Sequence, residues 1–199
     1  MWMNNIAKFA ALPLVLLCLA GAARPAPSLT FEGLGPVRIG MTEKELLMLG
    51  FSDPQRSADW QSDEEYLACH YLVNEKDYPD AGFMINESRL VRIDLGADAA
   101  GGTWKSLSGA MIGMTETEVV SIYGSRLILD DHPYLGDAGS YLVLLSGDGR
   151  HKMIFETATP DESGEQFSSA PSQGPNGRKR VTSFRAGLVE PVGYIEGCS

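Results

Sequence analysis

A seven-residue segment occurs twice in this chain and constrains its architecture more than any other feature. Residues 39–45 read Ile-Gly-Met-Thr-Glu-Lys-Glu, and residues 112–118 read Ile-Gly-Met-Thr-Glu-Thr-Glu. In each copy the Thr, Thr42 or Thr115, is followed three residues later by a Glu, the spacing that satisfies free N–H groups at a helix start. Such self-similarity indicates a duplicated unit. We therefore predict two copies of one module, each opening with a capped helix of roughly two to three turns.

Apolar segments downstream of the two helices also match, which extends the repeat to a sheet. Residues 71–73 and 83–85 resemble segments 70 residues later, and residues 89–96 resemble a segment 91 residues later. The added 21 residues lie at about 159–180, a segment rich in Pro, Ser, Gly and charge that is typical of a solvated loop. In the first copy the same connection is the tight turn Glu87-Ser88. The predicted fold class is α+β, with two tandem helix-plus-antiparallel-sheet repeats in which short helices pack on antiparallel strands.

The N-terminus is typical of a cleaved secretory signal. Lys8 precedes an apolar run at 9–21, which ends in small residues and is too short for a membrane span. Cys18 follows the bulky Leu17, where a lipobox has a small residue, so we expect no lipid anchor. The mature chain has no apolar stretch long enough to span a bilayer, and we expect a periplasmic or secreted protein. The predicted segments are a signal peptide at 1–23, a first repeat at 24–98 and a second repeat at 99–199.

Two cysteines, Cys69 and Cys198, remain once the signal is removed. In an oxidising compartment such a pair favours a disulfide, which would tie the first strand region of copy one to the C-terminus. The alternative is a free nucleophilic or metal-binding thiol, which needs a nearby His. His70 adjoins Cys69, but neighbours along a strand point to opposite faces. We predict the disulfide.

The charge balance indicates the kind of partner. The chain has 16 Lys and Arg against 26 Asp and Glu, a formal net charge of −10. An acidic surface repels nucleic acid and anionic lipid, and it favours a basic protein partner. The same balance is also common in soluble proteins that have no charged partner.

The densest polar cluster is Asp130-Asp131-His132-Pro133. Together with His151 or His70 it could supply oxygen and nitrogen ligands to a divalent metal. A polar turn before Pro133 explains the same residues without a function. We therefore assign no metal site, and we keep as the alternative function a metal-assisted hydrolase that uses Asp131, His132 and His151.

Other catalytic patterns are missing from the sequence. There is no G-x-S-x-G segment for a serine hydrolase. The Gly-x-Gly segments at 33–35 and 147–149 lack the strand, turn and helix setting of a phosphate-binding loop, and we interpret them as ordinary turns. We predict no catalytic residue and no cofactor.

Aromatic residues are the remaining candidates for recognition, because binding surfaces are enriched in Tyr and Trp. Trp60, Tyr78 and Tyr134 lie in loop-like segments, and the last two fall between strands of their respective copies. Each of the three either contacts a partner or completes the core. For the aromatic residues inside apolar runs we predict a core position; these are Tyr71, Tyr123 and Tyr141.

The repeated helix entry, G-M-T-x-x-E followed by Leu or Val, resembles that of the beta-lactamase inhibitor protein (BLIP) superfamily and, more loosely, of the SmpA/OmlA outer-membrane assembly lipoproteins. The resemblance implies helices that back an antiparallel sheet, with both copies joined into one slightly concave surface that grips a protein. The inhibitor has a disulfide within each repeat, whereas here one bridge would join distant segments, so inhibition of a beta-lactamase does not carry over. The ending Tyr194-Ile195-Glu196-Gly197-Cys198 is similar to that of bacterial envelope proteins without an assigned activity. We predict a non-enzymatic protein-binding module: an inhibitor, an immunity protein or an envelope-assembly accessory.

Overall fold

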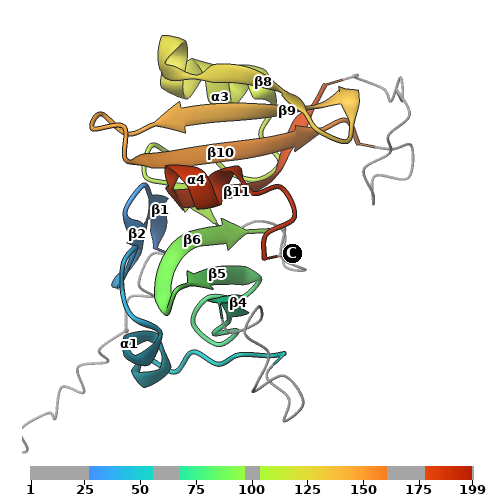
Figure 1. Ribbon diagram of the computed structural model, residues 1–199. Coiled ribbons are helices and arrows are strands. Elements are labelled where there is room, and N and C mark those ends of the chain that lie inside the picture. The colour runs from blue at the N-terminus through green and yellow to red at the C-terminus, as the bar shows by residue number, and fades with distance from the viewer. Residues whose placement is uncertain (1–26, 56–67, 97–103, 161–177, 199) are drawn as a thin grey trace, which may run out of the picture.

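The computed structural model of the protein describes residues 27–55, 68–96, 104–160 and 178–198, and within these ranges the fold is α+β, as predicted (Figure 1). The smaller sheet has the strand order β3 (Val37–Arg38), β2 (Gly33–Leu34), β1 (Ser28–Thr30) and β7 (Lys105–Ser106). The larger sheet has the order β4 (Cys69–Leu72), β5 (Ala81–Asn86), β6 (Arg89–Leu95), β11 (Arg180–Leu188), β10 (His151–Ala158), β9 (Gly136–Leu145) and β8 (Ile128–His132). The helices are α1 (Glu43–Met48), α3 (Glu116–Tyr123), which is followed by the 3₁₀ turn η2 (Gly124–Arg126), and α4 (Val189–Gly193).

Helices α1 and α3 begin at the two predicted capping boxes. The Thr42 hydroxyl oxygen accepts a hydrogen bond from the Glu45 amide at 3.3 Å, and the Glu45 carboxylate accepts one from the Thr42 amide at 2.8 Å. Thr115 and Glu118 repeat the arrangement at 3.3 and 2.8 Å. The repeated segment therefore has the same local structure in both copies, because each box satisfies two of the N–H groups that a helix start leaves free.

The main hydrophobic core lies between one face of the larger sheet and the elements packed on it, which are α1, α3 and the smaller sheet. The strands of the larger sheet alternate in side-chain direction, so every second residue faces this core. Burial of each large apolar side chain contributes roughly 2–3 kcal/mol to folding. The core includes Phe83, Phe155 and Phe184 of the sheet, Leu46 of α1, Val119 of α3 and Leu29 of β1.

The opposite face of the larger sheet carries α4. Val192 of this helix is fully buried and packs with Tyr141 of β9 and Ile154 of β10 in a second, smaller cluster. Figure 1 shows α4 in front of β10 and β11. The sheet is therefore covered by different elements on its two faces.

Strands β6 and β11 join the two halves of the larger sheet. They pair antiparallel, with Asp94 opposite Arg185 at the middle of the ladder. On either side of this pair, Ile93 lies opposite Ala186 and Leu95 lies opposite Phe184. In the predicted alignment of the copies, Asp94 corresponds to Arg185, so the ladder is centred on equivalent residues.

The contact between each helix entry and its strand is the same in both halves. In the first half the Arg89 guanidinium donates to the Gly40 carbonyl at 2.8 Å, and in the second half Arg180 donates to the Gly113 carbonyl at 2.8 Å. The backbone bonds agree as well: Gly40 N to Leu90 O (2.7 Å) and Leu90 N to Met41 O (2.8 Å) correspond to Gly113 N to Val181 O (2.8 Å) and Val181 N to Met114 O (2.8 Å).

The pairing registers correct one detail of the sequence alignment. Strand β5 has a register shift after Met84 and strand β10 has one after Glu156, which makes Phe83 equivalent to Phe155. The offset there is 72 residues rather than the predicted 70, while Tyr71 and Tyr141 keep the offset of 70. The longer connection of the second half is therefore about 19 residues longer, because a β-bulge changes register without leaving a clear sequence signal.

Some predictions fall outside the described residues. The predicted signal at 1–23 lies there, as do Trp60 and residues 161–177 of the predicted loop. Among the described helices, none has the length and apolar character needed to cross a membrane.

Candidate functional site

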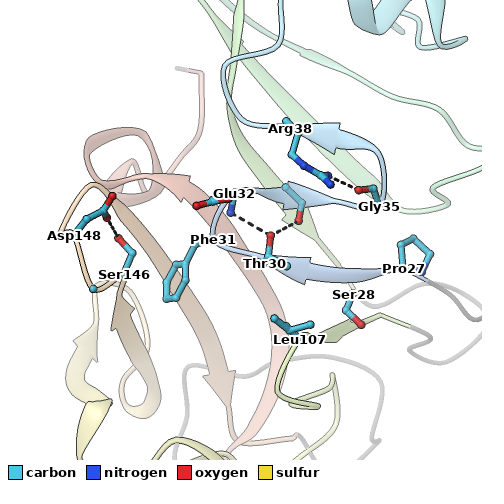
Figure 2. Close-up of a pocket in the computed structure, with 12 residues that line it drawn as sticks. Pro27, Ser28, Thr30, Phe31, Glu32, Gly35, Arg38, Leu107, Ser146 and Asp148 are labelled. Carbon is cyan, nitrogen blue, oxygen red and sulfur yellow. Dashed lines mark hydrogen bonds between the residues drawn. The ribbon is translucent and has the colours of Figure 1, made fainter.

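An open groove lies between the β1–β2 hairpin and the turn that joins β9 to β10 (Figure 2). Its volume is about 750 Å³. Three segments distant in the sequence line it, at residues 27–38, at Leu107 and at 146–148. Both Gly-x-Gly segments of the sequence belong to these linings, and both form turns, as predicted.

The β1–β2 hairpin forms one wall. The Thr30 hydroxyl donates to the Gly33 carbonyl at 3.0 Å and accepts from the Glu32 amide at 3.2 Å. Gly33 is needed because a Cβ atom there would lie 2.0 Å from the Val37 carbonyl oxygen. These contacts fix the tight turn from which the Phe31 side chain points toward the groove in Figure 2.

The β9–β10 turn forms the facing wall. The Asp148 carboxylate accepts from the Ser146 hydroxyl at 2.6 Å, from the Arg150 amide at 3.1 Å and from the Arg150 side chain at 2.6 Å. The hydrogen bond from Ser146, followed by those from Arg150, holds the pKa of Asp148 well below its ordinary value. This wall therefore carries a fixed negative charge at neutral pH.

The groove combines an apolar floor with charged rims. Leu107 is 75 % exposed, and the partly buried Phe31 lies beside it in Figure 2. Arg38 lies at one rim, where its guanidinium donates to the carbonyls of Gly35 and Val37. Exposed apolar side chains inside a polar rim are characteristic of surfaces that bind another protein.

Sequence reasoning missed this groove. Strands β1, β2 and β7 have two or three residues each, too few for a periodic pattern to show. The available signal was the presence of two Gly-x-Gly turns, but nothing in the sequence indicates that these turns face each other.

The structure does not bring the predicted aromatic residues together. Tyr134 lies in the β8–β9 turn and is 59 % exposed, and its hydroxyl donates to the Glu196 carboxylate at 2.5 Å. Tyr78 is only 7 % exposed, and its ring stacks between Phe51 and Trp104. Tyr78 is therefore a core residue, and its prediction as a partner-binding residue was wrong, because burial of the ring outweighs its position in a polar loop.

The predicted metal-binding set does not converge. The His132 Nε2 atom lies 2.8 Å from Glu156, and its Nδ1 accepts from the amides of Tyr134 and Leu135. His151 is five residues from Glu156 along β10, about 16 Å away in a strand.

Metal–ligand bonds are about 2 Å long, so Asp131, His132 and His151 cannot hold one ion, and the hydrolase based on them was wrong. The described residues contain no other group of three His, Cys, Asp or Glu side chains placed to bind a metal.

No protein-family model matches the sequence. Nor does any curated protein or solved structure match it significantly. The resemblance to the BLIP superfamily therefore remains an expectation from the two helix entries.

The predicted disulfide is present. Cys69 and Cys198 are joined with an S–S distance of 2.04 Å and a Cα–Cα distance of 5.4 Å. The bridge fastens the C-terminus to β4, at one edge of the larger sheet. A free thiol at either position is excluded in this structure.

The C-terminal segment covers part of the larger sheet on the face opposite α1 and α3. The Arg92 guanidinium donates to the carbonyls of Pro191 at 3.1 Å and Tyr194 at 2.6 Å, and the Arg185 Nε donates to the Val192 carbonyl at 2.9 Å. Both arginines are buried. The middle of this face is thus occupied by the protein's own chain, which leaves the groove and the sheet edges as the more accessible surfaces.

Proposed function

We propose that this chain is a secreted or periplasmic, non-enzymatic protein-binding module, and that the groove between the β1–β2 hairpin and the β9–β10 turn holds a segment of the partner. The observation that carries the proposal is the exposure of Leu107 beside Phe31 inside a rim of charged side chains. An apolar anchor of the partner would cover both side chains and remove their surface from water. Roles that fit such a module are those of an inhibitor, an immunity protein or an envelope-assembly accessory.

The module is proposed to be a tandem duplication related in fold to the BLIP superfamily. Three observations support this: the two capping boxes, the matched helix-to-strand hydrogen bonds, and the β6–β11 ladder centred on Asp94 and Arg185. The first repeat is placed at 24–98 and the second at 99–199. The disulfide is compatible with the proposed compartment, because such bonds persist in oxidising environments.

The partner is proposed to be a basic protein. The formal net charge of −10 attracts cationic surfaces over long range, and Glu32 and Asp148 place negative charge at the groove itself. The same charge argues against nucleic acid as the partner.

A comparative pull-down tests the groove. Wild-type mature protein and a Leu107→Glu variant are immobilised, exposed to envelope extract at two salt concentrations, and the retained proteins are quantified by mass spectrometry. The matched control is Met48→Glu, which changes another exposed apolar side chain on α1. We expect at least one basic protein that wild type and control retain equally and that Leu107→Glu loses at least tenfold. Equal retention of every protein by all three baits would contradict the proposed function.

A further inference from the structure

Strand β8 forms one edge of the larger sheet. It pairs with β9, and within the described part of the chain no strand pairs with its other side. Figure 1 shows β8 at the outer margin of the sheet, next to α3. Every second backbone N–H and C=O group of such an edge points away from the sheet and can pair with an added strand.

The first half of the molecule shows what this position looks like without an apolar edge. Ile128 lies opposite Val143 in the second half, and Ser52 lies opposite Val73 in the first half. The valines are equivalent, because the β4–β5 and β9–β10 registers align them at an offset of 70 residues. Ser52 is therefore the counterpart of Ile128.

The two halves differ in chemistry at these positions. The first half has the polar pair Ser52-Asp53, whereas the second half has Ile128, which is 55 % exposed, and Leu129, which is 67 % exposed. A fold that accepts Ser and Asp here does not require Ile and Leu for its core. An exposed apolar pair on an open edge is normally avoided, because it promotes pairing with other chains.

The acidic pair Asp130-Asp131 follows directly on the same strand, and both side chains are exposed. The edge thus presents two apolar side chains followed by two negative charges. A strand added beside it would gain a cross-strand contact at each of these positions.

We propose that β8 is a docking edge that takes up an extended segment of a basic partner protein as an additional strand, with apolar residues of that segment beside Ile128 and Leu129 and Lys or Arg residues beside Asp130 and Asp131. This inference rests on the protein-binding function proposed above, but it uses a different surface from the groove. Main-chain hydrogen bonds supply affinity in this mode of binding, and the alternating side chains supply specificity.

Charge distinguishes this occupant from a second copy of the chain. Each chain has a formal net charge of −10, and pairing of two β8 edges would bring two acidic pairs into one strand ladder. Like charges at neighbouring positions of a ladder are destabilising. A basic segment from another protein replaces this repulsion by attraction.

The test uses a displayed library of random twelve-residue peptides, selected on the full mature protein. Peptides that bind are synthesised, and their dissociation constants are measured for wild type and for the double variant Ile128→Ser with Leu129→Asp. This variant installs the residues of the first half at the equivalent edge, so it is expected to fold, which circular dichroism and a melting curve confirm. Each peptide is also made in two forms that carry N-methyl groups on alternate residues.

We expect enriched peptides that combine apolar residues with Lys or Arg. Their affinity should fall at least tenfold in the double variant and in one of the two N-methylated forms, and it should not change in Leu107→Glu. Three results would overturn the proposal: no peptide enriched on wild type above the double variant, binding that survives both N-methylated forms, or wild-type self-association that the double variant abolishes. Peptides that depend on Leu107 instead would reject the β8 edge while supporting the groove.

Discussion

Glu156 connects two buried side chains on the face of the larger sheet that carries α4. Its carboxylate lies 3.0 Å from an Arg185 guanidinium nitrogen and 2.8 Å from the His132 ring. The Tyr141 ring covers the same guanidinium, with 5.0 Å between the ring centroid and the Arg185 Cζ atom. Arg185 and His132 are almost fully buried, so their polar atoms depend on these partners rather than on water.

Substitution Glu156→Ala is expected to lower the free energy of unfolding by about 2–4 kcal/mol, because it leaves a buried cation without its carboxylate partner. Urea unfolding at pH 7 measures the change. The matched control is Asp130→Ala, which removes an exposed carboxylate from nearby β8 and should change the free energy by less than about 0.5 kcal/mol. Equal effects of the two substitutions would show that the Glu156 contacts do not stabilise the fold.

The capping boxes make stability depend on pH. Hydrogen bonds from the Thr42 amide and hydroxyl lower the pKa of Glu45, and those from Thr115 do the same for Glu118. A carboxyl group with a lowered pKa in the folded state stabilises the fold above its ordinary pKa of 4.5, and this contribution is lost as the pH falls below that value.

We therefore predict that the double variant Thr42→Ala with Thr115→Ala loses about 2 kcal/mol at pH 7, about 1 kcal/mol for each cap. Between pH 5 and pH 3 the variant should lose less additional stability than wild type, because the carboxylates no longer have their capping partners. Urea unfolding across this pH range is the measurement. Parallel curves for the two proteins would contradict the role of the boxes.

At the scale of elements, the parts of the fold that the sequence predicts are those with local signals. The Thr-x-x-Glu spacing placed the starts of α1 and α3 correctly, and Tyr71 and Tyr141 matched in register. The alignment of β5 with β10 was wrong by two residues, because a bulge leaves no composition signal.

The same limit explains the site. Predicting the groove requires knowing that the β1–β2 hairpin meets the β9–β10 turn, which is a tertiary contact between polar turns without a pattern of their own. The open edge of β8 was visible only as an acidic cluster, since burial of His132 and exposure of Leu129 depend on the pairing with β9.

Gly187 allows the two halves to approach at the β6–β11 ladder. A Cβ atom at this position would lie 2.2 Å from the Val91 carbonyl oxygen, so Gly187→Ala would force the strands apart. We expect a loss of about 1–3 kcal/mol in the free energy of unfolding, the usual cost of overpacking. Gly147→Ala is the control, because a Cβ atom there meets no atom within 4 Å. A thermal shift for Gly187→Ala no larger than that of the control would argue against close pairing.

At the scale of the whole molecule, the larger sheet continues from β4 to β8 through the β6–β11 ladder, and the disulfide fastens the C-terminus across it. The bridge joins residues 129 positions apart in the chain. Cross-linking so long a loop restricts the unfolded chain by roughly 5 kcal/mol in the chain-entropy model, which is an upper value.

The variant Cys69→Ser with Cys198→Ser should therefore unfold at a clearly lower urea concentration than wild type, with a loss of about 3–5 kcal/mol. Wild type in excess dithiothreitol should approach the variant, and the reductant should leave the variant unchanged. If the variant and wild type unfold at the same urea concentration, the C-terminal segment is held by its other contacts alone.

The central claim is that two copies of one module form a single sheet through β6 and β11, which places the groove and the β8 edge on one rigid body. Nuclear Overhauser effects between backbone protons of the mature protein test it most directly. The account predicts cross-strand effects that link Asp94 with Arg185 and, on either side, Ile93 with Ala186 and Leu95 with Phe184. If these effects are absent while those within each half are present, the halves do not share a sheet and the account is wrong.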